Sequence, residues 1–353
     1  MTDRFIAVPS FASSGAAPPT APPPRVPSGR VPIVVRPTAE RLALAAEFGH
    51  VARLVASPDV TDVFVNGGED VWVDRGAGLV RADVGPLSDA QARDLAVRLV
   101  ALGGRHVDEA TPCVDVRLAG GVRVHVVLAP VSPTGALISI RVPQARRLDL
   151  DALAGSGMFD RDPAKLDRIL RAVGARTNLL ITGAGGSGKT TLLAALLAQA
   201  ASDERIVTIE DVAELRIDHP HVVALQTRQA NVEGAGDLGL ERLLRESLRM
   251  RPDRLVLGEC RGGEVREMLS ALNTGHDGGA STLHANSLDD VPARLEALGA
   301  LAGMNTSAIA RQAVSAIGLV LHVERAAGSR RVAAVGRLVL VGDGRLSIEQ
   351  EPW

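Results

Sequence analysis

Asn178-Leu-Leu-Ile-Thr-Gly-Ala-Gly-Gly-Ser-Gly-Lys-Thr-Thr-Leu-Leu193 is the stretch from which the expected fold of this chain follows. Its apolar start, residues 179–181, predicts a buried strand, and Lys189 opens an apolar helix that continues through Leu197. The glycine-rich turn between them matches the pattern G-x-x-x-x-G-K-[ST], in the strand, loop and helix order that this pattern requires. An ordinary glycine-rich turn before a helix is the alternative, and it leaves the agreement of the loop and both flanks unexplained.

The residue types in this turn suit the binding of phosphate. Glycines let consecutive backbone N–H groups curl around an anion without a Cβ clash, and the new helix points its positive end at the same place. The Lys189 ammonium can reach the β- and γ-phosphates, and the Thr190 hydroxyl can ligate Mg²⁺. We therefore predict a nucleoside triphosphate site, and its residues are Gly183, Ala184, Gly185, Gly186, Ser187, Gly188, Lys189, Thr190 and Thr191.

The composition limits the class of protein. With 353 residues, 46% of them hydrophobic, the chain can build two domains with separate cores. A net charge of −2 and 2% aromatic residues argue against a nucleic acid partner. Cys113 and Cys260 are too few for a disulfide framework or a metal knuckle, which favours a reducing cytoplasm. The chain shows neither a membrane-spanning run nor a signal peptide, so we expect membrane association only through a partner.

The first residues of the chain, 1–38, form a proline-rich arm. Residues 1–37 hold nine of the twenty prolines, with Ala, Ser and Gly between them. Such a segment cannot bury enough apolar surface to offset the entropy of ordering it. We expect the arm to be disordered, and both an inert leader and a docking segment for a partner stay open.

Residues 39–145 are expected to form a small α+β domain. Apolar residues from Leu42 to Val55 recur on one helical face, and Ser88 with Gln91 reads as a capping box that starts a second helix. Alternating apolar and polar residues predict the strands between and after these helices. The expected strands cover residues 60–65, 71–73, 114–118, 122–127 and 137–141.

Two arginines stand out in this domain. Arg123 alternates with apolar neighbours, and Arg141 ends a strand. Strand arginines usually lie on the solvated face of a half-buried sheet. A contact to phosphate is the functional alternative, and the two arginines alone do not decide between these interpretations.

Residues 146–163 are interpreted as a linker, and residues 164–353 as a second domain. From residue 178 onward strands and helices alternate, which indicates a doubly wound, mainly parallel α/β sheet. Ligands of such sheets bind beyond the carboxyl ends of the strands. Glu210 and Asp211 follow the second expected strand, 205–209, and Glu259 follows the third, 254–258.

Carboxylates at these places suit Mg²⁺-dependent hydrolysis of a phosphoanhydride, which needs a metal and a group that orients or deprotonates water. Capping of the following helix is the structural alternative for each of them. His284 follows a short expected strand, and a lone histidine in such a place is more often structural or on the surface.

Taken together, the motifs resemble the secretion ATPase superfamily, the hexameric motors of type II and type IV secretion and of pili. The resemblance covers residues 39–325. Within the superfamily the chain looks most like the Tad/Flp pilus ATPases, the CpaF-like branch, and it lacks the C-x-x-C pairs of the type II branch. Two departures are Gln229-Ala230, where two prolines are frequent, and the unaligned tail after Val323. The matching segments are the phosphate loop, 208–215 (the Asp box), 227–236, 248–254, 255–264 (Walker B) and 273–286 (the His box).

This resemblance implies a RecA-like second domain, ATP and Mg²⁺ as ligands, and roles for individual residues. Lys189 and Thr190 would bind phosphate and Mg²⁺, and Glu259 would hold Mg²⁺ through water. Glu210 would polarise the attacking water with support from Asp211, and His284 would sense the γ-phosphate or contact a neighbouring subunit. Which of Glu210 and Glu259 is the base stays open. The resemblance also turns Arg123 and Arg141 into a phosphate clamp.

The function that the resemblance implies is an ATP-hydrolysing motor. It would work as a homo-hexamer at the inner face of the cytoplasmic membrane and pass its motion to an inner-membrane platform protein of a Tad/Flp-type pilus. A type IV secretion or conjugal transfer motor is the alternative within the family. A non-hydrolysing nucleotide switch and a nucleic acid helicase are alternatives of other classes, and the net charge and scarce aromatics argue against the helicase.

Overall fold

The structure is a computed structural model of the whole chain. It describes residues 43–67, 70–76, 78–85, 87–142, 149–228, 236–326 and 329–353. The proline-rich arm, the start of the expected linker and the Gln229-Ala230 departure lie outside the described residues.

The N-terminal domain contains a six-stranded sheet in which every neighbouring pair is antiparallel. The order is β3-β2-β1-β6-β5-β4, and residues on most strands alternate between buried and exposed, which confirms the predicted pattern. β3 was not predicted, because its residues are all exposed and show no alternation. The strands are β1 (Asp62–Asn66), β2 (Asp70–Asp74), β3 (Leu79–Arg81), β4 (Cys113–Arg117), β5 (Arg123–Val127) and β6 (Leu137–Arg141).

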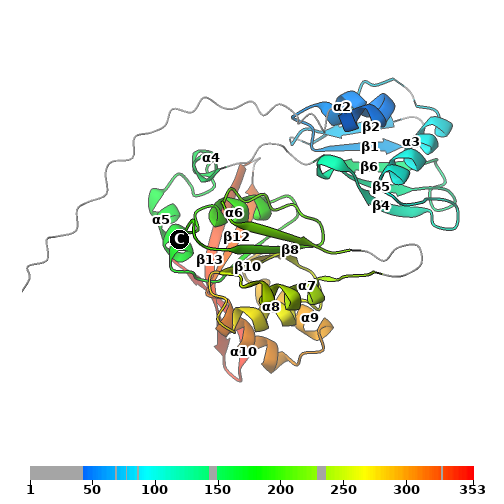
Figure 1. Cartoon of the computed structure of the whole chain (residues 1–353). Coiled ribbons are helices and arrows are strands. Elements are labelled where there is room, and N and C mark those ends of the chain that lie inside the picture. Colours follow the sequence, from blue (N-terminus) through cyan, green and yellow to red (C-terminus); the bar gives the residue numbers. More distant parts are fainter. Residues whose placement is uncertain are drawn as a thin grey trace, which may run out of the picture. The chain divides into compact units, whose positions relative to one another are not determined.

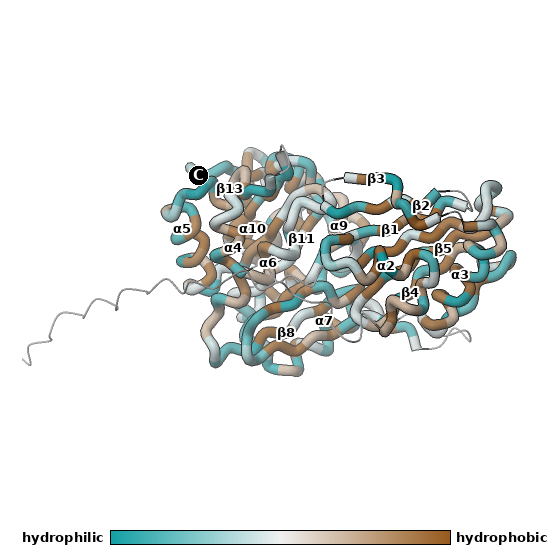
Figure 2. Tube along the Cα trace, turned by 90° about the horizontal axis from the view of Figure 1, so that it is seen from above, coloured by the Kyte–Doolittle hydropathy of each residue, from teal (hydrophilic) through white to brown (hydrophobic). Residues whose placement is uncertain are grey.

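Helices bury the apolar face of this sheet. α3 (Asp89–Leu102) packs against β4, β5 and β6, and its capping box is confirmed: the Gln91 N–H donates to Ser88 Oγ at 3.3 Å. The first expected helix forms as η1 (Ala46–Val51) and α2 (Ala52–Ala56). The brown stretches along β1 and β5 in Figure 2 belong to the apolar residues that the domain buries. A short 3-10 turn, η2 (Ala119–Gly121), joins β4 to β5.

The second domain is built on an eight-stranded sheet with the order β14-β13-β12-β7-β11-β10-β8-β9. All pairs from β12 to β9 are parallel, which confirms the doubly wound α/β prediction. The antiparallel strands β13 and β14 extend this sheet and were not predicted. The strands are β7 (Leu179–Gly183), β8 (Ile206–Glu210), β9 (Val222–Gln226), β10 (Arg254–Cys260), β11 (Ala280–His284), β12 (Leu319–Ala326), β13 (Ser329–Val341) and β14 (Arg345–Glu351).

Helices cover both faces of this sheet (Figure 1). One face, called here the α6 face, packs Ile181 against α4 (Leu150–Gly155), α5 (Pro163–Gly174) and α6 (Lys189–Leu197). The other, called the α8 face, packs Leu180 against the remaining helices. Neighbouring residues of β7 thus enter separate cores, as successive strand residues must. The helices of the α8 face are α7 (Leu240–Ser247) with η3 (Leu248–Met250), α8 (Val265–Leu272), α9 (Val291–Leu301) and α10 (Thr306–Ala316).

The segment expected as a linker contributes to this second core. Its described part begins at Asp149, whose side chain accepts a hydrogen bond from the Ala152 N–H at 2.8 Å and caps α4. Leu153 and Phe159 are buried on the α6 face. The core of the second domain therefore begins before residue 164. Among the helices that the structure describes, none has the length and apolarity needed to cross a bilayer.

Candidate active site

The phosphate loop, residues 183–191, joins the end of β7 to the start of α6. Gly188 caps α6 with a φ of 101°, a left-handed conformation that favours glycine. A Cβ on Gly183 would lie 2.1 Å from the carbonyl oxygen of Val323, so only glycine fits this close approach to β12. Residues 184–186 are exposed, while Ser187 and Lys189 are buried. The predicted loop is therefore open to a ligand on one side and fixed to the sheet on the other.

Lys189 is folded back onto its own loop. Its Nζ donates to the carbonyl oxygens of Gly183 at 3.0 Å and Ala184 at 2.9 Å, and the side chain is almost fully buried. Burial lowers the pKa of Lys189, although the nearby Glu259 carboxylate partly offsets that effect. The ammonium is thus held at the loop by weak partners that a phosphate can replace.

Glu259 and His284 lie together beside this loop. His284 Nε2 is 2.7 Å from Glu259 Oε1, and Arg261 Nη2 donates to Glu259 Oε2 at 2.5 Å. Burial alone would raise the pKa of Glu259, but the hydrogen bond and charge of Arg261, with His284 and Lys189, hold it below its usual value. Burial and the Lys189 charge lower the pKa of His284. A Cβ placed on Gly185 would lie 3.8 Å from His284 Cε1, so His284 also borders the loop.

The third strand was expected over residues 254–258 with Glu259 at its end, and the structure extends it by one residue beyond Glu259. β10 continues to Cys260, and Glu259 lies within the strand at an irregularity of the β10–β11 register. Every residue of β10 except Glu259 is buried, so the strand has no alternating pattern that would mark its end.

Glu210 ends β8 and is only 4% exposed. Its Oε1 accepts N–H groups of Glu214 at 2.8 Å and Leu215 at 3.0 Å, whereas its Oε2 is buried without a hydrogen-bond partner among the described residues. Burial raises the pKa of Glu210 despite these two hydrogen bonds, and burial also raises the pKa of Asp211. A buried carboxylate with one free oxygen can accept a proton from a water molecule that it orients.

The two sheet arginines are bound to carboxylates. Arg123 Nη2 is 2.8 Å from Glu214 Oε1, and Arg141 Nε donates to Asp62 Oδ1 at 3.2 Å. Neither of these contacts involves the phosphate loop, so the expected clamp stays a prediction.

Sequence reasoning missed two other arginines. Arg261 donates a hydrogen bond to Glu259. Its position two residues after Glu259 in the sequence is the signal that could have identified it. Arg330, on β13, donates from Nε to the Gly186 carbonyl oxygen at 3.1 Å. No motif marked it, since it lies in the tail that could not be aligned.

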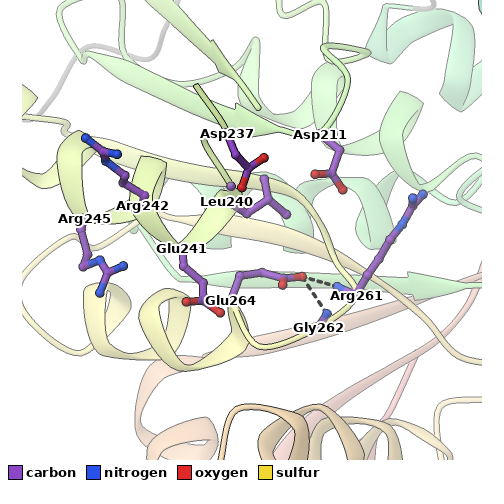
Figure 3. A pocket seen from close by; sticks show the side chains of 10 residues that line it. Asp211, Asp237, Leu240, Glu241, Arg242, Arg245, Arg261, Gly262 and Glu264 are labelled. Atoms are coloured by element: carbon purple, nitrogen blue, oxygen red, sulfur yellow. Dashed lines mark hydrogen bonds between the residues drawn. The ribbon is translucent and has the colours of Figure 1, made fainter. Parts of the chain in front are cut away.

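A hollow of about 520 Å³, which Asp211 of the candidate site helps to line, is shown in Figure 3. Asp211 and Arg261 line one side of it, and Glu241, Arg242 and Arg245 of α7 line another. The dashed lines in Figure 3 show the Glu264 carboxylate accepting the N–H groups of Arg261 and Gly262. The hollow is lined by no residue of the phosphate loop, so it adjoins the candidate site without being its centre.

The residues of the site fit a triphosphate with a magnesium ion. Ser187 Oγ is buried without a hydrogen-bond partner among the residues described, and the exposed loop offers backbone N–H groups. No group of three or more His, Cys, Asp or Glu in the described ranges is arranged to hold a metal by itself. Mg²⁺ beside phosphates needs little more than a hydroxyl, a carboxylate and water, which Thr190 and Glu259 can supply.

Fold and site together define a P-loop protein with a RecA-like sheet. A family described as "Type II/IV secretion system protein" matches residues 45–333, which is most of the chain. The chain belongs to this family, as its motifs predicted. The Tad/Flp branch within the family stays a prediction.

Relatives support the same family. A Mycobacterium tuberculosis protein, provisionally named for conjugal transfer, is 47% identical over 297 residues, covering 82% of this chain and 84% of its own. The type IV secretion system protein PtlH of Bordetella pertussis is 36% identical over 258 residues, which cover 67% of this chain and 76% of PtlH. The crystal structure of the pilus retraction motor PilT with bound ADP is similar in fold, with a TM-score of 0.54 at 21% identity, covering 88% of this chain and 81% of PilT.

Proposed function

We propose that this chain hydrolyses ATP and passes the resulting motion to a secretion or transfer machine. The observation that carries the proposal is the assembly of Lys189, Glu259 and His284 around one phosphate loop. At the end of β8, Glu210 adds a carboxylate whose Oε2 has no hydrogen-bond partner among the described residues. Family membership supports nucleotide hydrolysis as the common activity.

In the proposed reaction the loop binds the triphosphate and Lys189 neutralises it. Lys189 exchanges the carbonyl oxygens of Gly183 and Ala184 for phosphate oxygens, which are stronger partners because they are charged. Mg²⁺, held by Thr190 and by Glu259 through water, would screen the charge that develops on the phosphates.

The environments of the two glutamates support different roles for them. A raised pKa makes Glu210 the stronger base, and its Oε2, which has no hydrogen-bond partner in the described ranges, can hold the proton of the attacking water. Glu259 is paired with Arg261 and His284, which favours its charged form and suits a role beside the metal. His284, with its lowered pKa, stays neutral at pH 7 and can report the state of Glu259 through Nε2.

Two machines are candidates for the partner. The names of the relatives favour conjugal transfer or type IV secretion. The Tad/Flp pilus is supported by the strings at 248–254 and 255–264. In either case we infer a homo-hexamer that works on an inner-membrane platform protein, and we retain the Arg123 and Arg141 clamp as part of this proposal.

Phosphate release by the full-length protein with Mg²⁺ and ATP tests the proposed activity. We expect Lys189→Ala to abolish release, because the loop loses the cation that neutralises the phosphates. Lys165→Ala is the matched control, since Lys165 lies on α5 and pairs with Asp160 outside the site. Normal release by Lys189→Ala would refute the site, and a wild-type protein that binds ATP without releasing phosphate would favour a nucleotide switch.

A further inference from the structure

β10 contains one residue more than β11 at the point where the two strands carry the candidate site. Leu257 lies opposite Ser281, and the next aligned pair is Cys260 with Leu283. Gly258 and Glu259 together therefore stand opposite the single residue Thr282. This two-against-one arrangement is a β-bulge.

The two cores show what the bulge does to the side chains. Val256 packs on the α6 face and Leu257 on the α8 face, as strand alternation requires. Cys260, three residues after Leu257, again packs on the α8 face, which an unbroken alternation would forbid. The bulge between Leu257 and Cys260 inserts the extra residue. The Glu259 side chain therefore lies on the same face of the sheet as Gly258, which is the α6 face.

The face on which Glu259 emerges is the one that carries the phosphate loop. α6, which follows the loop, packs on the α6 face; His284 pairs with Glu259, and the Lys189 charge lowers the pKa of Glu259. A regular strand would instead direct Glu259 into the apolar core of the α8 face, where a carboxylate is strongly disfavoured. The bulge is thus what brings Glu259 to the site.

One side chain holds this bulge. Thr282 is 1% exposed, and its Oγ1 donates to the carbonyl oxygen of Gly258 at 2.7 Å. A bulge disrupts the ladder of backbone hydrogen bonds locally, and a hydroxyl of the neighbouring strand satisfies the carbonyl here.

Gly258 links the bulge to the second carboxylate. A Cβ on Gly258 would lie 2.6 Å from Glu210 Cγ and 3.1 Å from Glu210 Oε1. Glu210 therefore lies across the bare backbone of Gly258, and the position of that backbone sets the position of Glu210 as well as that of Glu259.

We propose that Thr282 is a positioning residue: through its hydrogen bond to Gly258 it fixes the β10 bulge, and so it holds Glu259 beside His284 at the phosphate loop and Glu210 against Gly258. This inference rests on the proposed ATP hydrolysis. In the part of the chain that the structure describes, no hydrogen bond joins Thr282 to either carboxylate, and Thr282 acts through the backbone of Gly258. A purely structural Thr282 would affect the amount of folded protein without changing the rate of each folded molecule.

The test compares Thr282→Val with Thr282→Ser in the full-length protein. Valine keeps the shape and removes the hydroxyl, whereas serine keeps the hydroxyl. We expect Thr282→Val to lower kcat by about tenfold or more while KM for ATP stays within about twofold, because misplaced groups cost rate more than binding. Thr282→Ser should restore most of kcat. Should Thr282→Val not fold, Thr282→Ala against Thr282→Ser makes the same comparison.

A second readout does not depend on hydrolysis. Cys260 follows the bulge and is buried, so its thiol should react slowly with a thiol reagent. In a Cys113→Ser background, which removes the exposed cysteine, Thr282→Val should speed the labelling of Cys260 and Thr282→Ser should not.

The outcomes separate this inference from the proposed function. Wild-type kcat and wild-type labelling in Thr282→Val would overturn the positioning role, while an inactive Lys189→Ala would leave the proposed function intact. A wild-type protein that releases no phosphate would refute the proposed function, and Cys260 labelling would still decide whether Thr282 holds the bulge.

Discussion

The N-terminal sheet is antiparallel and buries one face, whereas the RecA-like sheet is mainly parallel and is covered by helices on both faces. In the first, alternate residues such as Arg123 remain available to solvent or to a partner. In the second, the strands are buried, and Gly183, Glu210 and Glu259 lie at or near the carboxyl ends of β7, β8 and β10. This difference predicts two kinds of effect. Substitutions at the strand ends of the parallel sheet should change turnover, and substitutions in the antiparallel core should change stability.

The largest effect is expected for Glu210→Gln. The amide cannot accept the proton of water, so kcat should fall by about 10²–10⁴-fold while binding of a fluorescent ATP analogue is retained. Glu246→Gln is the control, since Glu246 pairs with Arg249 on the surface. If Glu210→Gln turns over at the wild-type rate while the same change at Glu259 abolishes hydrolysis, the assignment of the base is reversed.

A core substitution in the antiparallel sheet should produce the opposite signature. Ile138 is 1% exposed and lies between Val65 and Val126 on neighbouring strands. Ile138→Ala should lower the free energy of unfolding by about 2–5 kcal/mol, because it removes buried methyl groups and leaves a cavity. The kcat of the molecules that remain folded should not change. A loss of kcat without a loss of stability would contradict the assignment of turnover to the parallel sheet and of stability alone to the antiparallel core.

Arg123→Ala sharpens the comparison, because it asks whether the antiparallel sheet contributes to chemistry at all. The Arg123–Glu214 pair is partly exposed and should contribute at most about 1 kcal/mol to stability. If Arg123 clamps phosphate, turnover should fall by about tenfold or more. Arg81→Ala, which removes a solvent-exposed arginine paired with Asp70 in the same sheet, is the control. Equal turnover in the two variants would exclude the clamp.

The smallest effect is expected in stability as a function of pH. The pKa of Glu210 is raised in the folded protein, so the folded state binds the proton more tightly than the unfolded chain. The stability that Glu210 contributes to the wild-type protein is therefore present at low pH, and it is lost as the pH rises through the pKa of Glu210 in the folded state. Glu210→Gln should melt at a higher temperature than wild type at pH 7, and the difference should shrink as the pH is lowered toward 4. A constant difference across this range would show that burial does not perturb Glu210.

Much of the site could be predicted because its signals are local. The phosphate loop needs glycines, a lysine and a threonine in consecutive positions, and the buried strands β7 and β8 are short apolar runs. Glu259 and His284 were each expected as site residues from the family's motifs, and the structure brings them together in a pair that was not predicted.

What the sequence did not reveal depends on how the strands pair. The bulge at Gly258 and Glu259 exists only in the register between β10 and β11. β9 lies at the sheet edge and is only half-buried, so it lacks the apolar run of its neighbours. β13 and β14 are antiparallel additions to a parallel sheet, and local patterns cannot assign a strand to a particular sheet.

The most direct measurement is a structure of the full-length protein with Mg²⁺ and a non-hydrolysable ATP analogue. We expect the phosphates to occupy residues 183–191, the Lys189 ammonium to have left the carbonyl oxygens of Gly183 and Ala184 for them, and Glu210 Oε2 to face the γ-phosphate. An analogue bound elsewhere, with Lys189 still hydrogen-bonded to its own loop, would contradict the assignment of the nucleotide site to the carboxyl ends of β7, β8 and β10.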